Sequence, residues 1–501
     1  MLVPAAVTLA LGCVGLVRVE LWRDELATWN AATRPVADLF AMAGNIDAFY
    51  FPYYLFTHFW IGIFGDSAAA LRAPSVLAAA GATALVALIG SRWFGRPAGF
   101  CAGTVFALIP MVSRMAQEAR PYAFAMLFVA LSTWLLLRAV DDPAWGRWAG
   151  YGAGMTALGA SQVTALTLVA GHAALVFVRW RRHRDNRVLR FAVAFAAALV
   201  PLAPLAVTSL GQPQVVTDLL PRPDLATLLG FTYPFPPDSA VWPQTFRSAW
   251  VAWIVLGLAV LAVVVAKRRQ EAALALGMFV LPLVVLWVAS QAGKSFYFPR
   301  YFVFLLPVAA VAAGITLAAA RRPAVWATAL AAVAAAGFAD QAAARSPDSH
   351  DHAFYPYPNM FSEYPGQHAA YTQLAERIRT GFRPGDAIVY PDRPNFWFTD
   401  TAIAYYLRGE PAPRDVFLAK SAVDNASLFA SDTTDYADRL RGTNRVWVVG
   451  LGERRDWFAA NPRLFAPPPS PAKVAAVTGD FETAEVSRVP GFTLTLMTRR
   501  P

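Results

Sequence analysis

Charged residues are scarce in this sequence, and their scarcity excludes an ordinary soluble protein. Only 15% of the 501 residues are charged, whereas soluble domains carry roughly a quarter, and 57% are hydrophobic. The formal net charge of +10 comes from 43 basic and 33 acidic residues. The basic residues are spread over short connecting segments rather than gathered on one face, which argues against a nucleic-acid partner. The composition therefore predicts an integral membrane protein.

The sequence also contains only two cysteines and none of the common nucleotide or metal signatures. Cys13 and Cys101 both lie inside apolar runs, so we expect packing residues rather than a disulfide or metal ligands. No glycine-rich fingerprint follows a strand pattern, and Walker and HExxH motifs are missing. A nucleotide-dependent reaction therefore has no support in the sequence. Nearly all basic residues are Arg, with only four Lys, which together with abundant Ala suggests a GC-rich bacterial genome.

What the sequence does contain is a series of long apolar runs. Most of nine such runs approach the roughly 20 residues that cross a hydrocarbon core, namely 2–17, 73–90, 98–112, 121–137, 191–210, 249–266, 272–290, 301–320 and 324–339. The glycine-rich stretch 148–178 is also apolar, and at about 1.5 Å per residue it is long enough for two short spans but too long for one. The sequence thus predicts eleven spans. The first run lacks the flanks of a signal peptide, so we expect it to be retained.

Basic residues concentrate in every second connection between these runs, namely 91–96, 138–147, 179–190, 267–269 and 321–322. With eleven spans, all five connections fall on one side, and basic residues near span ends mark the cytoplasmic face. We therefore expect the N-terminus inside and all residues after 340 outside, in a bacterial cytoplasmic membrane. Nine spans with 148–178 re-entrant would give the same sidedness.

The segment after residue 340 changes character. A polar, proline-rich linker begins near residue 346, and the stretch 368–382 then has helical periodicity. Short β-type runs follow at 386–391, 445–450 and 492–500. We therefore predict two domains: a transmembrane domain over 1–340 and a small α/β extracytoplasmic domain with its linker over 341–501.

Two adjacent carboxylates, Asp24 and Glu25, follow the first apolar run on the predicted outer side. A carboxylate at the membrane boundary can deprotonate an acceptor hydroxyl, and partial burial among aromatic residues would raise its pKa toward a useful range. The alternative is structural: both residues cap an interfacial helix or pair with Arg23. The residue pattern alone leaves both interpretations open.

An aromatic stretch at 45–65 carries Asp47 and His58 and is interrupted by Pro52. Such a segment suits a helix lying in the membrane interface, where Tyr and Trp prefer to sit. The simpler interpretation is an aromatic belt in which His58 is a structural histidine.

Two outward turns combine cations with aromatic residues. The turn 113–124 holds Arg114, Gln117, Glu118, Arg120 and Tyr122. Arg binds phosphate oxygens in a bidentate way, so this turn could bind a phosphate, or an ion pair of Glu118 with one of the arginines could merely shape it.

In the second turn, at 293–304, Lys294 and Arg300 flank aromatic residues at the start of a span. Two cations on this face oppose the usual charge bias and need an anionic partner, either lipid headgroups in general or a specific polyprenyl phosphate.

In their order, these motifs resemble the lipid-linked-sugar glycosyltransferases of the membrane GT-C fold. The resemblance is closest to the bacterial branch related to protein O-mannosyltransferases and to the lipid A aminoarabinose transferase. It is carried by a Trp, Gly-Asp, Leu-Arg-x-Pro, Phe-Gly and Gln-Glu-Ala-Arg-x-Tyr series between Trp60 and Tyr122, and by "FPRYFVFLLP" at 298–307. Many relatives have a His-Pro-Pro element where this chain has "FYFPYY" at 49–54.

This resemblance implies inverting transfer of a sugar from a polyprenyl-phosphate donor to an acceptor hydroxyl outside the membrane. It implies Asp24 as catalytic base, with Glu25 orienting the acceptor. Further implied roles are phosphate binding for Arg120, Lys294, Arg300 and Arg72, and contacts in the substrate pocket for Asp47, His58, Gln117, Glu118 and Tyr122. No metal is required, although Asp24, Glu25 and Asp47 could recruit a divalent cation.

Several alternatives stay open at this stage. Mannose and arabinose both fit the donor sugar, and the acceptor can be a protein, a glycan or a lipid. A lipid or sugar transporter or flippase is the main rival, although the spans are almost free of charge and no internal repeat is visible. A non-catalytic scaffold that binds envelope partners would leave the clustered outward charges unexplained.

Overall fold

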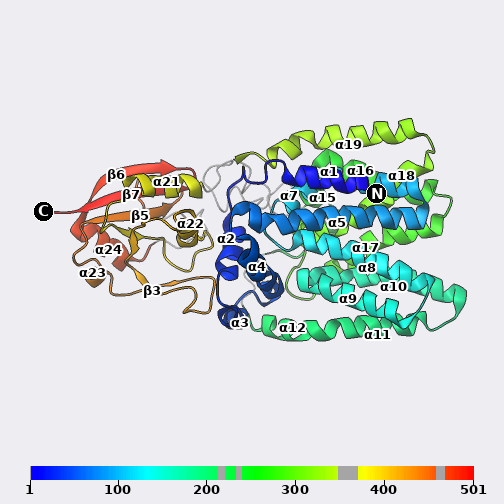
Figure 1. The fold of residues 1–501 in the computed structure, drawn as a ribbon, viewed down its shortest axis with the longest axis horizontal. Coiled ribbons are helices and arrows are strands. Elements are labelled where there is room, and N and C mark those ends of the chain that lie inside the picture. The colour runs from blue at the N-terminus through cyan, green and yellow to red at the C-terminus, as the bar shows by residue number, and fades with distance from the viewer. Residues whose placement is uncertain (1, 213–219, 233–239, 348–369, 459–468) are drawn as a thin grey trace. The chain divides into compact units, whose positions relative to one another are not determined.

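The computed structural model describes residues 2–212, 220–232, 240–347, 370–458 and 469–501 (Figure 1). Most of the predicted linker lies outside these residues. The chain forms two compact units. One comprises residues 1–16, 47–56 and 69–345, and the other comprises 17–46, 57–68 and 346–501. The second unit thus joins parts of the segment between α1 and α5 to the C-terminal segment, and the linear boundary at residue 340 stays a prediction.

The first unit is helical. Before the second basic connection it contains α1 (Leu2–Cys13), η1 (Ala48–Tyr50), the start of α4 (Phe51–Phe64), α5 (Ala68–Phe94), α6 (Arg96–Leu108), α7 (Pro110–Ala116) and α8 (Tyr122–Asp141). After it come α9 (Trp145–Ser161), η2 (Val163–Leu168), α10 (Val169–His183), α11 (Arg187–Leu199), η3 (Val200–Leu202), α12 (Ala203–Leu210), α14 (Leu225–Leu229), α15 (Val241–Phe246), α16 (Ala249–Val265), α17 (Arg269–Gln291), η4 (Pro299–Leu305), α18 (Leu306–Ala319) and α19 (Pro323–Ala343).

The predicted multi-span character is confirmed. Among the described residues, seven helical segments are long and apolar enough to cross a membrane, and α6 with α7, bent by 67°, would make an eighth. Helices α1 and α16 are shorter apolar helices. The stretch 148–178 divides into two helical parts, since α9 ends at Ser161 and η2 with α10 begins at Val163. The total of eleven spans stays a prediction.

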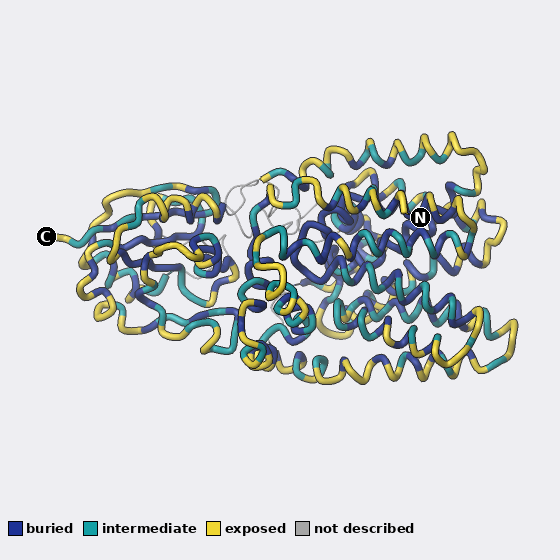
Figure 2. Tube along the Cα trace, in the orientation of Figure 1, coloured by how far each residue is buried: buried dark blue, intermediate teal, exposed yellow. Residues whose placement is uncertain are grey.

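Helix α18 lies at the centre of this unit, whereas α19 lies at its edge (Figures 1 and 2). Along its apolar stretch, the η4–α18 segment is 89% buried, compared with 17% for α19. The close packing of α18 on α6 depends on Gly314, because a Cβ there would lie 2.6 Å from the backbone nitrogen of Ala102. Small residues at such contacts let helix backbones approach closely in a membrane.

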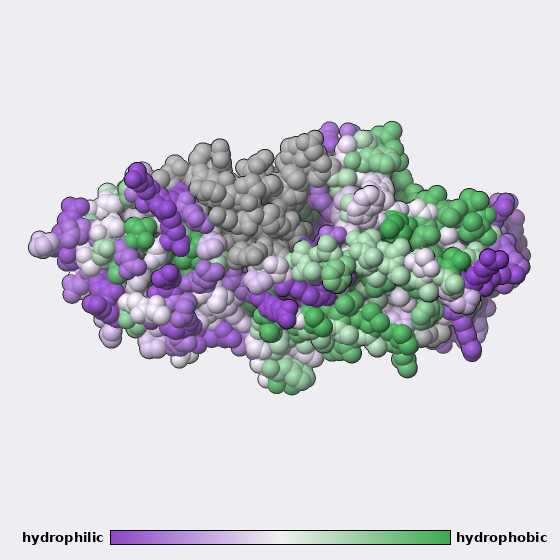
Figure 3. Space-filling view, turned by 90° about the horizontal axis from the view of Figure 1, so that it is seen from above, coloured by the Kyte–Doolittle hydropathy of each residue, from purple (hydrophilic) through white to green (hydrophobic). Residues whose placement is uncertain are grey.

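Three of the five basic connections, 91–96, 138–147 and 179–190, contact one another or the start of α17 at one end of the helical unit. Arg92 pairs with Asp141 at 2.8 Å, and Arg187 donates to the carbonyl of Val140 at 2.9 Å. At the start of α17, Glu271 accepts hydrogen bonds from Trp93 at 2.9 Å and from Arg179 at 3.2 Å. In Figure 3, hydrophilic atoms gather at this end, beyond a largely hydrophobic surface.

The second unit contains α2 (Arg23–Ala32), α3 (Val36–Asn45), the end of α4 and an α/β fold formed by the C-terminal segment. The elements of that fold are α21 (Tyr371–Gly381), β1 (Ala387–Val389), α22 (Thr399–Tyr406), β2 (Arg414–Asp415), β3 (Leu418–Lys420), β4 (Ser431–Asp432), α23 (Tyr436–Arg439), β5 (Arg445–Leu451), α24 (Pro471–Asp480), β6 (Phe481–Val489) and β7 (Phe492–Arg499). The predicted helix and three predicted strands correspond to α21, β1, β5 and β7, so the α/β prediction is confirmed.

The five-stranded sheet has the order β2-β1-β5-β7-β6. Strand β1 is parallel to β2 and β5, while β7 is antiparallel to β5 and β6. Alternating apolar residues of β5, including Val446 and Val448, pack into a core with Val389, Phe417 and Val477. The carboxyl end of β1 leads into the loop that carries Asp392 and Arg393, and Asp415 is the last residue of β2, so parts of an ionic network lie at this edge of the sheet.

Candidate functional site

In the helical unit, the buried residues Arg120 and Tyr54 form a group with Tyr50 and Asp47, which are half-buried. Arg120 donates a hydrogen bond to the hydroxyl of Tyr54 at 3.2 Å, and that hydroxyl donates to Asp47 at 2.8 Å. The Arg120 guanidinium also lies 4.1 Å from the ring centre of Tyr50. Burial, and next the charge of Asp47, hold the pKa of Tyr54 well above its ordinary value. The tyrosine thus stays protonated and fixes the guanidinium next to a carboxylate.

The turn after α7 is held by interactions of two other predicted site residues. Glu118 lies 3.4 Å from Arg114, and both side chains are almost completely buried. This is one of the ion pairs that the sequence allowed as a structural alternative. The Gln117 side chain donates to carbonyl oxygens at the end of α1, at 3.0 Å to Gly12 and 2.7 Å to Val14. The turn is therefore tied to the point where the chain leaves α1.

Three further predicted residues of this unit have different surroundings. Arg300, in η4, lies over the ring of Tyr122 at 5.7 Å and is buried. Arg72, in α5, is buried and donates to the carbonyl of Leu16 at 2.7 Å. Lys294 is exposed. The structure therefore brings Arg300 to Tyr122 and Arg120 to Asp47, and it places Arg72 at the end of the first apolar run.

In the second unit, Asp24 and Glu25 lie in the first turn of α2. Glu25 is fully buried, and its carboxylate accepts a hydrogen bond from the backbone of Trp22 at 3.4 Å. Glu25 therefore caps the helix, as the structural alternative proposed. The Asp24 side chain is 15% exposed and lies 3.9 Å from Arg23, so its carboxylate reaches solvent. Carboxylates in the first turn also interact favourably with the helix dipole.

His58 lies in the same unit and contacts the backbone of α2. Its Nδ1 lies 2.9 Å from the carbonyl oxygen of Ala32, and its ring meets Phe59 edge to face. In this position the imidazole supports the carboxyl end of the helix that carries Asp24.

Sequence reasoning missed residues that complete these groups. Tyr50 and Tyr54 were read only as part of an aromatic belt, although their i, i+4 spacing was a signal that both share one helix face. Arg345 was not predicted as a site residue either, although it donates to the carbonyls of Val14 at 3.1 Å and Leu11 at 2.7 Å. Arg247 was missed as well; burial, and then the charge of Arg114, lower its pKa to about 9.

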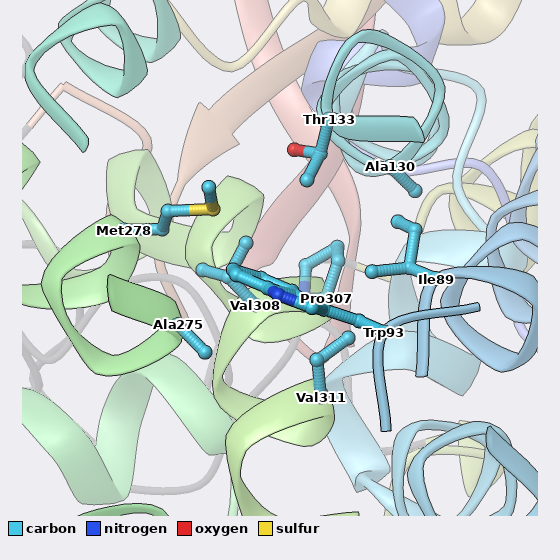
Figure 4. A pocket seen from close by; sticks show the side chains of 9 residues that line it. All are labelled: Ile89, Trp93, Ala130, Thr133, Ala275, Met278, Pro307, Val308 and Val311. Carbon is cyan, nitrogen blue, oxygen red and sulfur yellow. The ribbon is translucent and has the colours of Figure 1, made fainter. Parts of the chain in front are cut away.

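A small cavity lies among α5, α8, α17 and α18, well inside the helical unit (Figure 4). Its volume is about 10 Å³, which is at the lower limit for one water molecule. The lining is apolar, with Met278, Val308 and Ile89 pointing inward beside Thr133 and Trp93. The cavity is therefore a packing gap rather than a substrate site.

Metal ligation has no cluster to support it in the described part of the chain. No three His, Cys, Asp or Glu side chains there gather closely enough to hold a metal ion. The involvement of a divalent cation stays a prediction.

Comparison with known proteins identifies the fold. Residues 51–207 match the family model described as dolichyl-phosphate-mannose-protein mannosyltransferase. Two crystal structures of ArnT from Cupriavidus metallidurans, one apo and one bound to undecaprenyl phosphate, match with TM-scores of 0.61 and 0.59 at 13% identity. Each match covers 99% of this chain and 97% of the ArnT chain. No curated protein matches the chain in sequence. The chain has the GT-C fold of ArnT, as the sequence resemblance implied.

Proposed function

We propose that this chain is a glycosyltransferase that moves a sugar from a polyprenyl-phosphate donor to an acceptor hydroxyl at the outer face of the bacterial cytoplasmic membrane. The observation that carries the proposal is the match to ArnT over nearly the full length of both chains, including ArnT bound to undecaprenyl phosphate. The family-model match over residues 51–207 supports the same class of reaction. Mannose and an arabinose-type sugar are the candidate donors.

Asp24 is the proposed catalytic base. It accepts the proton of the acceptor hydroxyl while that oxygen attacks the anomeric carbon on the face opposite the phosphate. The bond between the anomeric carbon and the phosphate oxygen breaks, the polyprenyl phosphate leaves with the electron pair, and the configuration inverts. The partial exposure of Asp24 supports this role, because an acceptor can reach it, whereas Glu25 is fully buried as a helix cap.

Cations bind the leaving phosphate in this proposal. Arg120 and Arg300 are buried guanidiniums set beside tyrosines, so their charge is held in a low-dielectric setting where it stabilises developing negative charge most strongly. Lys294 and Arg72 are further candidates, although Arg72 also binds the backbone of Leu16. These side chains supply the required positive charge without a metal ion.

The first test concerns the reaction itself. We expect Asp24→Asn to lower transfer by about a hundredfold to ten-thousandfold, the usual contribution of a general base. Asp38→Asn is the matched control, because Asp38 also lies in the first turn of a helix, α3, of the same unit. The readout is mass spectrometry of envelope glycans, glycoproteins and lipids from a deletion strain complemented with each variant. Wild-type transfer by Asp24→Asn would refute the base assignment, and an unchanged envelope in the deletion strain would refute the proposed function.

The second test concerns donor binding. Replacing Arg120 with Gln should weaken the binding of undecaprenyl phosphate to the purified chain, whereas Arg441→Gln, at an exposed position of the C-terminal segment, should leave it unchanged. Equal affinity of both variants for undecaprenyl phosphate would remove Arg120 from the phosphate site.

The proposed sidedness can be tested separately. In a chain with Cys13 and Cys101 replaced by Ser, an impermeant thiol reagent should label Asp438→Cys in intact cells and Arg182→Cys only after lysis. Both positions are exposed in the structure. The reverse labelling pattern would overturn the orientation.

A further inference from the structure

The helix that carries Asp24 packs against the C-terminal part of the chain. Residues 17–46 and 57–68 form one compact unit with residues 346–501, and within it α2 packs against α22. The segment that follows α1 thus packs against a distant part of the sequence. These contacts therefore bear on the position of Asp24.

The entry to α2 is fixed by two hydrogen-bonding groups. The backbone N–H of Leu21 donates to the hydroxyl of Tyr406 at 2.8 Å. Burial, and then the charge of Glu20, raise the pKa of Tyr406, which therefore stays a neutral hydroxyl. One residue earlier, the Glu20 carboxylate accepts hydrogen bonds from the backbone N–H groups of Tyr371 at 3.2 Å and Thr372 at 2.8 Å.

Glu20 therefore caps a helix from another part of the chain. Tyr371 and Thr372 are the first two residues of α21, and their N–H groups have no partner inside that helix. A carboxylate at this end satisfies both donors and interacts favourably with the helix dipole. Only three residues separate Glu20 from Asp24, and α2 begins at the last of them, Arg23, so a shift at Glu20 is passed on to Asp24.

Further contacts hold the later part of α2 and the residues just beyond its end. Trp29 meets the ring of Tyr405 edge to face at 5.2 Å, and its indole donates to Asp66 at 2.8 Å. After the helix, Arg34 donates to the carbonyl of Ser427 at 2.6 Å. Helix α2 is thus held at its start, along its length and just beyond its end.

Helix α22 is itself held rigidly. Asp400, in its first turn, accepts a hydrogen bond from the backbone of Thr401 at 2.8 Å and from Arg393 at 2.9 Å. Arg393 is almost fully buried and also pairs with Asp415 and with Asp432 at 2.7 Å. The position of Tyr405 and Tyr406 is therefore set by an ionic network at the carboxyl edge of the sheet.

We propose that α22 and the start of α21 position the catalytic base, with Tyr406 and Glu20 as positioning residues that set the place and orientation of Asp24. This inference rests on the proposed function. It gives the C-terminal segment a part in the reaction, through its contacts with α2. A displacement of about 1 Å in a reacting group can cost a factor of about 100 in rate, so loss of either contact is expected to reduce turnover.

The test uses Tyr406→Phe and Glu20→Gln in the full chain, with Tyr436→Phe as the matched control. Tyr436 lies in α23 of the same C-terminal segment and packs on Phe417 in its core. The donor is undecaprenyl phosphate carrying the sugar, and the acceptor is the one identified in the deletion strain. We expect kcat to fall by about ten- to a hundredfold for each test variant, with the KM for the donor unchanged. The control should keep the wild-type kcat.

Hydrogen–deuterium exchange of the same variants separates positioning from unfolding. Amides of residues 20–32 should exchange about fivefold faster for each lost hydrogen bond of roughly 1 kcal/mol, while those of β5 and β7 should not change. Wild-type kcat in both Tyr406→Phe and Glu20→Gln, with Asp24→Asn inactive, would overturn the positioning role and leave the proposed function intact. An Asp24→Asn variant that transfers sugar at the wild-type rate would instead refute the role of Asp24.

Discussion

The guanidinium of Arg120 donates to the hydroxyl of Tyr54 at 3.2 Å, across 66 residues of sequence. The same hydroxyl donates to Asp47 at 2.8 Å, so the tyrosine links a cation to an anion. Because Tyr54 is fully buried, its hydroxyl holds the guanidinium in one position. We expect this position to be the one that binds a phosphate.

This relationship predicts the effect of Tyr54→Phe. Loss of the hydroxyl should weaken the binding of undecaprenyl phosphate by about tenfold or more, since a hydrogen bond to a charged group is worth about 1.5–3 kcal/mol. Isothermal titration calorimetry on the detergent-solubilised chain measures this. Tyr151→Phe also removes a buried hydroxyl, one that bonds to His172 in the helical unit, and should bind as wild type does. Equal affinities for Tyr54→Phe and wild type would show that the Tyr54 hydroxyl does not hold Arg120 in a phosphate-binding position.

The contacts of Gln117 predict a role in stability. Its amide nitrogen donates to carbonyls at the end of α1, so Gln117→Glu replaces a donor with a charge that repels them. We expect a loss of about 1–3 kcal/mol in the free energy of unfolding, with the KM for the donor unchanged. Thermal unfolding and steady-state kinetics measure the two quantities. A raised KM at unchanged stability would instead place Gln117 in the substrate pocket.

The sequence predicted the elements of the fold better than it predicted their contacts. Apolar runs identify the segments between α5 and α19 because each must cover its own backbone in lipid. The division of 148–178 followed from length alone. By contrast, the pairing of Leu21 with Tyr406 joins residues 385 positions apart, and no periodicity encodes it. The same holds for Arg393, whose three carboxylate partners come from α22, β2 and β4 of the C-terminal segment.

The candidate site shows the same difference between what residue type predicts and what packing determines. Residue type marked Arg120 and Asp24 as candidates, because a guanidinium suits a phosphate and a carboxylate can act as a base, and their roles stay predictions. Residue type did not distinguish Asp24 from Glu25, because the difference in their exposure arises only when α2 packs in the folded unit. Only the family resemblance separated the two. The ion pair between Arg114 and Glu118 was one of several pairings that their spacing allowed, and packing selected it.

The contact between α18 and α6 predicts opposite effects of one substitution at two glycines. Gly314→Ala would place a Cβ 2.6 Å from the backbone of Ala102 and should cost about 1–3 kcal/mol through forced separation of the helices. Gly257→Ala, in α16, meets open space, so its better helix propensity should raise stability or leave it unchanged. Thermal unfolding of both purified variants tests the pair. Equal midpoints would mean that α18 and α6 pack less closely than described.

The ionic network around Arg393 predicts a loss of stability that depends on pH. Arg393→Leu leaves Asp400, Asp415 and Asp432 without their shared cation, and removal of one partner of a buried ion pair costs about 3–5 kcal/mol. Burial already raises the pKa of Asp415, and the charge of Arg393 opposes that shift. Without Arg393 the pKa of Asp415 rises further, so the folded variant binds a proton at a pH where the unfolded chain does not.

The sign of the pH effect follows from this difference in proton binding. The folded variant gains stability as the pH falls from 7 toward the ordinary Asp value of 3.8, and that gain is lost as the pH rises through the raised pKa. The deficit of Arg393→Leu relative to wild type should therefore be smaller at pH 5 than at pH 7, measured by chemical unfolding of the full chain. Arg441→Leu, which removes an exposed pair with Asp438, should change stability by less than about 1 kcal/mol at either pH. A deficit that grows on acidification would mean that Arg393 does not offset the charge of these three carboxylates.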